Sequence, residues 1–212
     1  MHLVMPRLYV ILDAGLMADS AEETAKQLIE AGVRLLQYRS KSGSACETLE
    51  LSRKLAVMSS IRGVTFFVND RPDIALMAAA AGVHVGQADL SVDDARAVVG
   101  SEKWIGVSTH NEVQFRAAIE SSADYIAVGP VFPTKSKVSP DPVIGTEFIR
   151  RVRGMTNKPI VAIGGITVER AAEVIEAGAD SVAVISDILR ARHPGTRAGQ
   201  YLDQLQAARS SR

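Results

Sequence analysis

The sequence predicts an α/β protein built as a single (β/α)8 TIM barrel. Eight short apolar runs recur along the chain, helical patterns lie between them, and most of the runs are continuously apolar. This last property is typical of parallel strands that helices cover on both faces. Eight units in 212 residues give about 26 residues per unit, near the lower end for such a barrel. The alternative, an open doubly wound sheet, usually has five or six strands.

Each expected strand is a short run rich in β-branched residues. The runs are Leu8–Leu12, Val33–Gln37, Thr65–Val68, Gly82–Val85, Trp104–Val107, Tyr125–Val128, Pro159–Ile163 and Ser181–Ile185. Amphipathic or alanine-rich stretches between them predict helices over Ala21–Ala31, Cys46–Ser60, Asp73–Ala81, Asn111–Ser121 and Val168–Ala177. Ser91 and Thr167 are expected N-caps, and the expected helix stops are Gly32, Gly82, Gly100 and Gly178. We expect one domain over residues 1–212, with a helical tail over 192–212 that contains a helix at Arg197–Ala208.

The composition restricts the class of protein. The 24 basic and 24 acidic residues cancel, so the chain lacks the basic excess of a general nucleic-acid binder. The longest apolar candidate, Ile74–Val83, is far shorter than a membrane span, and the first residues lack the pattern of a signal peptide. The single cysteine, Cys46, excludes an internal disulfide framework. We therefore expect a cytoplasmic protein whose partners are small molecules and that binds neither nucleic acid nor membrane. The sequence is compatible with a homo-oligomer.

Charged and polar residues follow the strands at their carboxyl ends, where TIM barrels build their sites. In strand order they are Arg39 and Lys41, then Asn69 and Asp70, Asp89, Ser108, Lys135 and Lys137, Gly164 and Gly165, and finally Ser186. Cations and glycine amides suit a phosphorylated substrate, and two acids suit a hard divalent ion held between phosphate oxygens. The Gly-Gly turn lies at the recurrent phosphate site of the barrel, after strand 7.

Each of these residues also has a simpler interpretation. Asp70 and Asp89 could cap the helices that follow them, and Arg39 and Lys41 could be solvated surface charges. The Gly-Gly pair could be a tight turn, and Ser186 could be an N-cap. His84 is expected as a packed barrel residue, and His110 could simply precede a helix. Only the convergence of the set on one end of the barrel points to a function.

Five motifs in this order resemble the thiamine phosphate synthase family. They are Gln37–Lys41, Val68–Arg71, Gly82–Asp89, Val128–Thr134 and Ala162–Ile166, and the likeness extends from about Leu8 to Leu189. The resemblance implies an enzyme, a transferase of thiamine biosynthesis. Its reaction would join a hydroxymethylpyrimidine pyrophosphate to a thiazole phosphate, giving thiamine phosphate and pyrophosphate, with Mg2+ as the expected metal.

The resemblance also implies roles for individual residues. The pyrimidine pyrophosphate would be bound by Gln37, Arg39, Lys41, Asn69, Ser108 and Lys137, and the metal by Asp70 and Asp89. The thiazole phosphate would be bound by Thr134, Ser136, Gly165, Ile185 and Ser186, where Ser136 replaces the usual threonine of the family.

Two further functions remain open at this point. One is a related isomerase that acts on a thiazole carboxylate phosphate and carries a histidine in the loop after strand 6, where this chain has Gly129 and Pro130. The other is a non-catalytic phosphate-binding barrel. The presence of Asn69, Asp70 and Asp89 together favours the synthase over the isomerase, and turnover with both substrates would separate it from the non-catalytic barrel.

Overall fold

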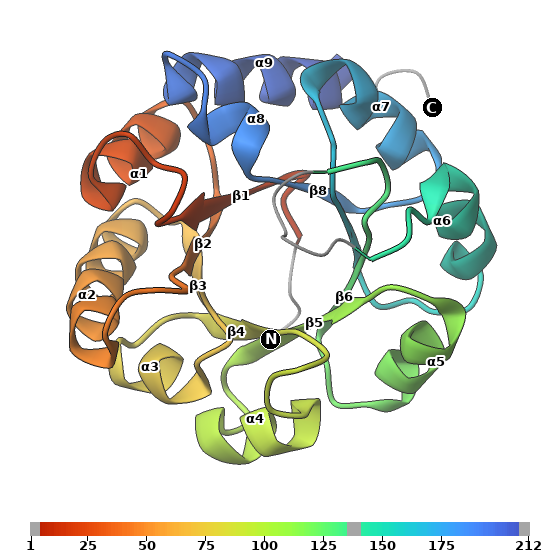
Figure 1. Ribbon diagram of the computed structural model, residues 1–212, viewed down its shortest axis with the longest axis horizontal. Helices are drawn as coiled ribbons and strands as arrows, with labels where there is room; N and C mark the ends of the chain where they lie inside the picture. Colours follow the sequence, from red (N-terminus) through yellow and green to blue (C-terminus); the bar gives the residue numbers. More distant parts are fainter. Residues whose placement is uncertain (1–4, 135–140, 208–212) are drawn as a thin grey trace.

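The computed structural model, which describes residues 5–134 and 141–207, contains a closed barrel of eight parallel strands surrounded by helices (Figure 1). The spatial order of the strands is their order in the chain, and the barrel closes where the last strand pairs with the first. The predicted fold class is confirmed.

All eight expected strands form, with bounds within two residues of those predicted. They are β1 (Leu8–Asp13), β2 (Leu35–Arg39), β3 (Thr65–Asn69), β4 (Gly82–Val85), β5 (Trp104–Thr109), β6 (Tyr125–Val128), β7 (Ile160–Ile163) and β8 (Ser181–Val184). The main difference is in β2, which lies two residues later than expected. As a result Arg39 is the last residue of the strand itself and is held in the parallel register opposite Asp13.

Helices follow the strands around the outside of the barrel. They are α1 (Ala21–Glu30), α2 (Ala45–Ile61), α3 (Pro72–Met77), α4 (Val92–Val99), α5 (Glu112–Glu120), α6 (Gly145–Arg153), α7 (Val168–Glu176), α8 (Ser186–Leu189) and α9 (Pro194–Ala207). The tail helix thus begins three residues before the expected Arg197. It packs between α1 and α7 and closes the outer ring (Figure 1). None of the helices in residues 5–134 and 141–207 combines the length and apolar character that crossing a membrane requires.

Two expectations about helix ends are wrong. The third helix ends at Met77 rather than Ala81, because Ala79 adopts a positive φ of 53°. Gly82 is not a helix stop but the first residue of β4, where a Cβ would lie 2.2 Å from the carbonyl oxygen of Trp104. Thr167 occupies the N-cap position of α7 as expected, although its side chain makes no capping hydrogen bond. Ser91, in contrast, accepts a hydrogen bond from the Asp94 amide at 3.1 Å, as an N-cap does.

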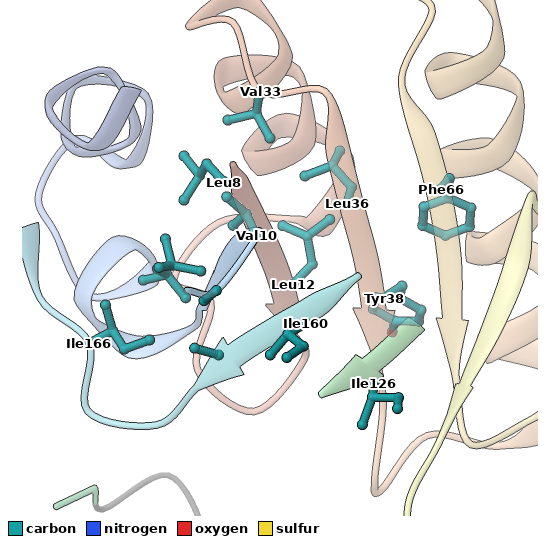
Figure 2. Close-up of a cluster of buried hydrophobic side chains, with 14 of the residues drawn as sticks. Leu8, Val10, Leu12, Val33, Leu36, Tyr38, Phe66, Ile126, Ile160 and Ile166 are labelled. Carbon is teal, nitrogen blue, oxygen red and sulfur yellow. The ribbon is translucent and has the colours of Figure 1, made fainter. Parts of the chain in front are cut away.

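Alternate residues of each strand are buried in two different layers. Leu8, Val10 and Leu12 of β1 face the helices and pack in the large outer cluster (Figure 2). Tyr9 and Ile11 point into the barrel, where they meet inward-facing side chains of the other strands. Because both faces are buried, the strands read as continuous apolar runs. The same alternation continues to the strand ends, where polar side chains therefore point toward the mouth of the barrel.

Candidate active site

A cavity of about 490 Å³ lies at the carboxyl ends of the strands and gathers the candidate residues. Its lining includes Gln37, Arg39, Lys41, Asn69, Asp70, Asp89, Ser108, Thr134, Gly165, Ile185 and Ser186. The remaining two candidates, Ser136 and Lys137, lie outside the described residues, as does Lys135. The structure therefore brings together every candidate side chain that it describes, drawn from loops and strand ends far apart in the sequence.

Arg39 is held in the cavity by an acid that the sequence analysis did not select. Its guanidinium forms an ion pair with Asp13, the last residue of β1, and both side chains are largely shielded from solvent. The other carboxylate oxygen of Asp13 accepts a hydrogen bond from the amide of Gly15 at 3.0 Å. Because a backbone amide holds one oxygen of the carboxylate, the other oxygen is fixed in place and restricts the guanidinium that pairs with it. Arg39 is therefore a positioned cation and not a freely solvated surface charge.

Lys41, Asp70 and Asp89 form a second charged group. The ammonium of Lys41 pairs with Asp70, and the carboxylate of Asp89 accepts a hydrogen bond from the amide of Gly86 at 2.8 Å. Neither acid caps a helix, since the N-cap positions of α3 and α4 belong to Arg71 and Ser91. Asp70 also has a φ of 62°, a conformation that costs a non-glycine residue energy and that recurs at functional sites.

The two carboxyl groups influence each other. Burial raises the pKa of Asp89, and a hydrogen bond with the Asp70 carboxyl together with the charge of Asp70 raises it further, against the opposing Lys41. Two acids in contact are unfavourable when both are ionised, and a divalent cation would relieve that repulsion. The described part of the chain has no cluster of three or more potential metal-ligating side chains. A magnesium ion that shares phosphate oxygens and waters needs only one or two carboxylates, so this pair fits it.

Backbone amides line the opposite side of the cavity. Gly164 and Gly165 follow β7 with φ values of 101° and 63°, and α8 begins directly after β8 with Ser186 as its first residue. Within the described residues, the amides of Gly165, Ile166 and Ser186 donate to no other group of the chain. Ser186 is not an N-cap, because Ile185 holds that position without a side-chain bond. Unpaired amides around one cavity form a cradle for an anion.

The C-terminal helix supports this amide cradle from behind. The hydroxyl of Tyr201 on α9 lies 3.0 Å from the carbonyl oxygen of Ile166 and 2.8 Å from a carboxylate oxygen of Asp187. Arg197 approaches the same carboxylate at 3.3 Å. The tyrosine is fully buried. A helix that the sequence analysis treated as a tail thus fixes the turns after both β7 and β8.

The floor of the cavity is polar, although it lies inside the barrel. Tyr9 is hydrogen-bonded to Gln37 at 2.6 Å and to Tyr125 at 3.2 Å. The two ring nitrogens of His84 lie 2.8 Å from the hydroxyl of Tyr125 and 2.8 Å from the hydroxyl of Ser108. Burial lowers the pKa of His84 to about 4. His84 is packed in the barrel as expected, but it also lines the cavity.

His110 reaches the cavity from the end of β5. Its Nδ1 lies 2.6 Å from the carbonyl oxygen of Gly129, and its Nε2 lies 3.5 Å from a carboxylate oxygen of Asp141. His110 does precede α5, as one interpretation of the sequence allowed, and its side chain also joins the end of β5 to the loop after β6.

A second hollow, of about 920 Å³, lies at the opposite ends of the strands. Two of the three arginines in its lining form ion pairs, Arg153 with Asp180 and Arg150 with Glu147.

Several known proteins resemble this chain over nearly its whole length. The family model described as thiamine monophosphate synthase matches residues 8–188. A thiamine-phosphate synthase of Koribacter versatilis is 50% identical over 96% of this chain and 97% of its own length. One from Chloroflexus aurantiacus is 42% identical over 90% of this chain and 88% of its own. A solved structure of thiamine phosphate pyrophosphorylase from Pyrococcus furiosus is 31% identical in sequence and superposes with a TM-score of 0.88. The superposition covers 95% of this chain and 96% of the Pyrococcus chain.

Proposed function

The chain belongs to the thiamine monophosphate synthase family, and we propose that it joins a hydroxymethylpyrimidine pyrophosphate to a thiazole phosphate. It is a transferase with the thiamine-phosphate synthase activity of its relatives. In the proposed reaction the bond between the pyrimidine methylene carbon and the pyrophosphate oxygen breaks, and the oxygen keeps the electron pair. The ring nitrogen of the thiazole supplies the new bond to that carbon. Thiamine phosphate and pyrophosphate are the products.

The observation that carries this proposal is that one cavity has two groups of residues suited to bind anions, on opposite sides. Arg39 and Lys41, with the paired acids Asp70 and Asp89, lie on one side. The amides around Gly165 and Ser186 lie on the other. A reaction between a pyrophosphate ester and a monophosphate needs both. A barrel that bound only one phosphate would need only the amide side.

On the pyrophosphate side, the positive charge of Arg39 and Lys41 would matter most as the leaving group departs. Charge on the departing oxygen grows toward the transition state, so fixed cations lower the barrier more than they strengthen substrate binding. Asp13 holds Arg39 in place for a bidentate contact with phosphate oxygens. Gln37, Asn69 and Ser108 would complete this side, together with Lys137, as the family resemblance implies.

Asp70 and Asp89 would hold Mg2+ with the pyrophosphate. When bound, the ion supplies positive charge to phosphate oxygens and orients the leaving group. Lys41, which pairs with Asp70 in this structure, would then be released toward the substrate. This exchange of partners explains why a lysine and two acids share one corner of the cavity.

On the thiazole side, the amides of Gly165 and Ser186 would bind the monophosphate, with Thr134 and Ile185 beside them. The family resemblance adds Ser136 to this set. Dipoles of unpaired amides favour an anion and leave the ring nitrogen of the substrate directed into the cavity. No general base is required, because that nitrogen attacks with its own lone pair.

The direct test mixes the purified protein with both substrates and Mg2+ and detects thiamine phosphate by mass spectrometry. Omitting either substrate, or adding a chelator, should abolish the product. A parallel sample with a thiazole carboxylate phosphate tests the isomerase alternative. Isomerised thiazole without any joined product would refute the proposal, and so would binding of both substrates without turnover.

A further inference from the structure

The hydrogen bonds beneath the cavity form one unbranched series across the barrel. It runs from Gln37 through Tyr9, Tyr125 and His84 to Ser108, with successive distances of 2.6, 3.2, 2.8 and 2.8 Å. The three middle side chains are buried. Its two ends, Gln37 and Ser108, line the cavity. No single strand contains more than one of the five residues.

The end group of Gln37 gives the series a direction. The amide nitrogen of Gln37 can only donate, so the hydroxyl of Tyr9 accepts from it. The bond between Tyr9 and Tyr125 can run in either direction. We assign Tyr9 as its donor, because this arrangement gives the hydrogen of each tyrosine hydroxyl an acceptor within the series. Tyr125 in turn donates its hydrogen to Nδ1 of His84, which must carry a lone pair.

The remaining proton of the imidazole is therefore on Nε2, and it is donated to the oxygen of Ser108. With its oxygen accepting from His84, the Ser108 hydroxyl directs its own hydrogen elsewhere, and the cavity is the open side. The opposite tautomer would reverse this bond, so that Ser108 donated to His84 and offered the cavity only lone pairs.

We propose that His84 is a positioning residue, fixed as the Nε2–H tautomer by Tyr125, which makes Ser108 a hydrogen-bond donor to the pyrophosphate. The inference rests on the proposed function, since it assigns the partner of Ser108 to the substrate on that side of the cavity. An anion accepts hydrogen bonds and repels lone pairs, so the direction of this one bond decides whether Ser108 assists or opposes substrate.

Tyr125→Phe removes the donor that fixes the tautomer and keeps the ring. That ring stacks on His84 at 5.5 Å between centroids and packs edge-on against Phe67. With no donor at Nδ1, both tautomers become accessible. We expect kcat with the pyrimidine pyrophosphate to fall about tenfold, the size of one charge-assisted hydrogen bond, while the KM of the thiazole phosphate stays unchanged.

Thr109→Val is the matched control. The Thr109 hydroxyl is fully buried and donates to the carbonyl oxygen of Ala127 at 2.9 Å, outside the series. Its loss costs a buried hydrogen bond, as Tyr125→Phe does, and should leave kcat unchanged. Equal loss of kcat in the two variants would overturn the inference, because the loss of any buried hydrogen bond would then be enough to lower kcat.

Two further variants test whether the effect passes through Ser108. In a Ser108→Ala background, Tyr125→Phe should cause no additional loss of kcat, because coupled residues are not additive. His84→Gln, whose amide nitrogen can replace Nε2 as a donor, should retain more activity than His84→Leu. Additive losses, or equal losses in the two His84 variants, would contradict the inference.

Nuclear magnetic resonance of the 15N-labelled imidazoles reads the tautomer without any assay of activity. His84→Gln assigns its signal among the four histidines of the chain. We expect an Nε2–H signal in the wild-type protein and an increased Nδ1–H population in Tyr125→Phe. A wild-type Nδ1–H signal would overturn the inference and leave the proposed function intact. An Nε2–H signal with a fully active Ser108→Ala variant would instead refute the contact of Ser108 with substrate in the proposed function.

Discussion

Replacing Asp89 with asparagine separates the proposed metal role of this carboxylate from its role in folding. The amide oxygen of the Asp89→Asn variant can still accept the hydrogen bond from Gly86, which is 2.8 Å long in the native protein. The variant loses the negative charge that faces Asp70. The expected result is therefore a protein that folds at least as well as the native one but responds poorly to magnesium.

The magnitude of the metal effect follows from the loss of one charged ligand out of two. A hydrogen bond or ligand contact to a charged group contributes about 1.5–3 kcal/mol, which corresponds to a change in affinity of about 10- to 150-fold. Half-maximal activity should need a correspondingly higher Mg2+ concentration. Because Asp70 and the substrate phosphates remain as ligands, excess Mg2+ should restore part of the rate.

The effect on stability has a definite sign. Burial and Asp70 raise the pKa of Asp89 in the folded protein, so ionised Asp89 disfavours the folded state at pH values above that raised pKa. The variant has no such charge and should unfold at an equal or higher temperature at neutral pH. As the pH falls through the folded pKa, the native carboxyl takes up its proton, and the difference between the two proteins should shrink.

The assay measures initial rates across a Mg2+ titration and thermal unfolding at neutral and acidic pH. Asp203→Asn is the control, because Asp203 is an exposed acid on α9, away from the cavity. The reasoning is refuted if the Asp89→Asn variant keeps the native rate at limiting Mg2+, or if it is less stable at neutral pH while the control is unaffected.

Three other substitutions test the remaining parts of the site. Arg39→Met removes the guanidinium and should lower kcat about 10- to 100-fold in steady-state assays; unchanged turnover in a folded variant would make Arg39 a surface residue. Gly165→Val adds a Cβ only 2.4 Å from the carbonyl oxygen of Pro133, at a position with a φ of 63°. Titrations should show that the variant loses more affinity for the thiazole phosphate than for the pyrimidine pyrophosphate. An equal loss of affinity for both ligands would indicate a folding defect. Tyr201→Phe removes the hydroxyl that contacts Ile166 and Asp187; we expect denaturant unfolding to show a loss of about 1 kcal/mol and the KM of the thiazole phosphate to rise, and an unchanged KM would mean that α9 does not support the amide cradle.

The fold could be predicted from local sequence patterns because each barrel strand is buried on both sides. Gly82–Val85 and Tyr125–Val128 form strands with the predicted bounds. The failures were at positions where tertiary contacts outweigh local signals. Gly82 has the appearance of a helix stop, yet the barrel requires it because the backbone of β5 lies too close for a side chain. The short α3 likewise ends early, where Ala79 turns the chain toward β4.

The candidate site was predicted in outline for a similar reason. Parallel strands bring their carboxyl ends to one side, so a list of the residues after each strand already contains Arg39, Asp70 and Asp89. Asp13 was missed because no residue that follows the first expected strand, Leu8–Leu12, was included among the candidates. The charged residue at the end of the first strand was the signal that could have found it.

The sequence by itself determined the eight strands, the parallel barrel and the end at which the polar residues gather, because these depend on local periodicity and on the order of the elements. Only the tertiary structure decided which polar groups meet. The pairing of Asp13 with Arg39 depends on the register between β1 and β2, and the series from Gln37 to Ser108 needs side chains from five strands inside one closed barrel. Register and closure are set by packing across the whole molecule, which no short stretch of sequence contains.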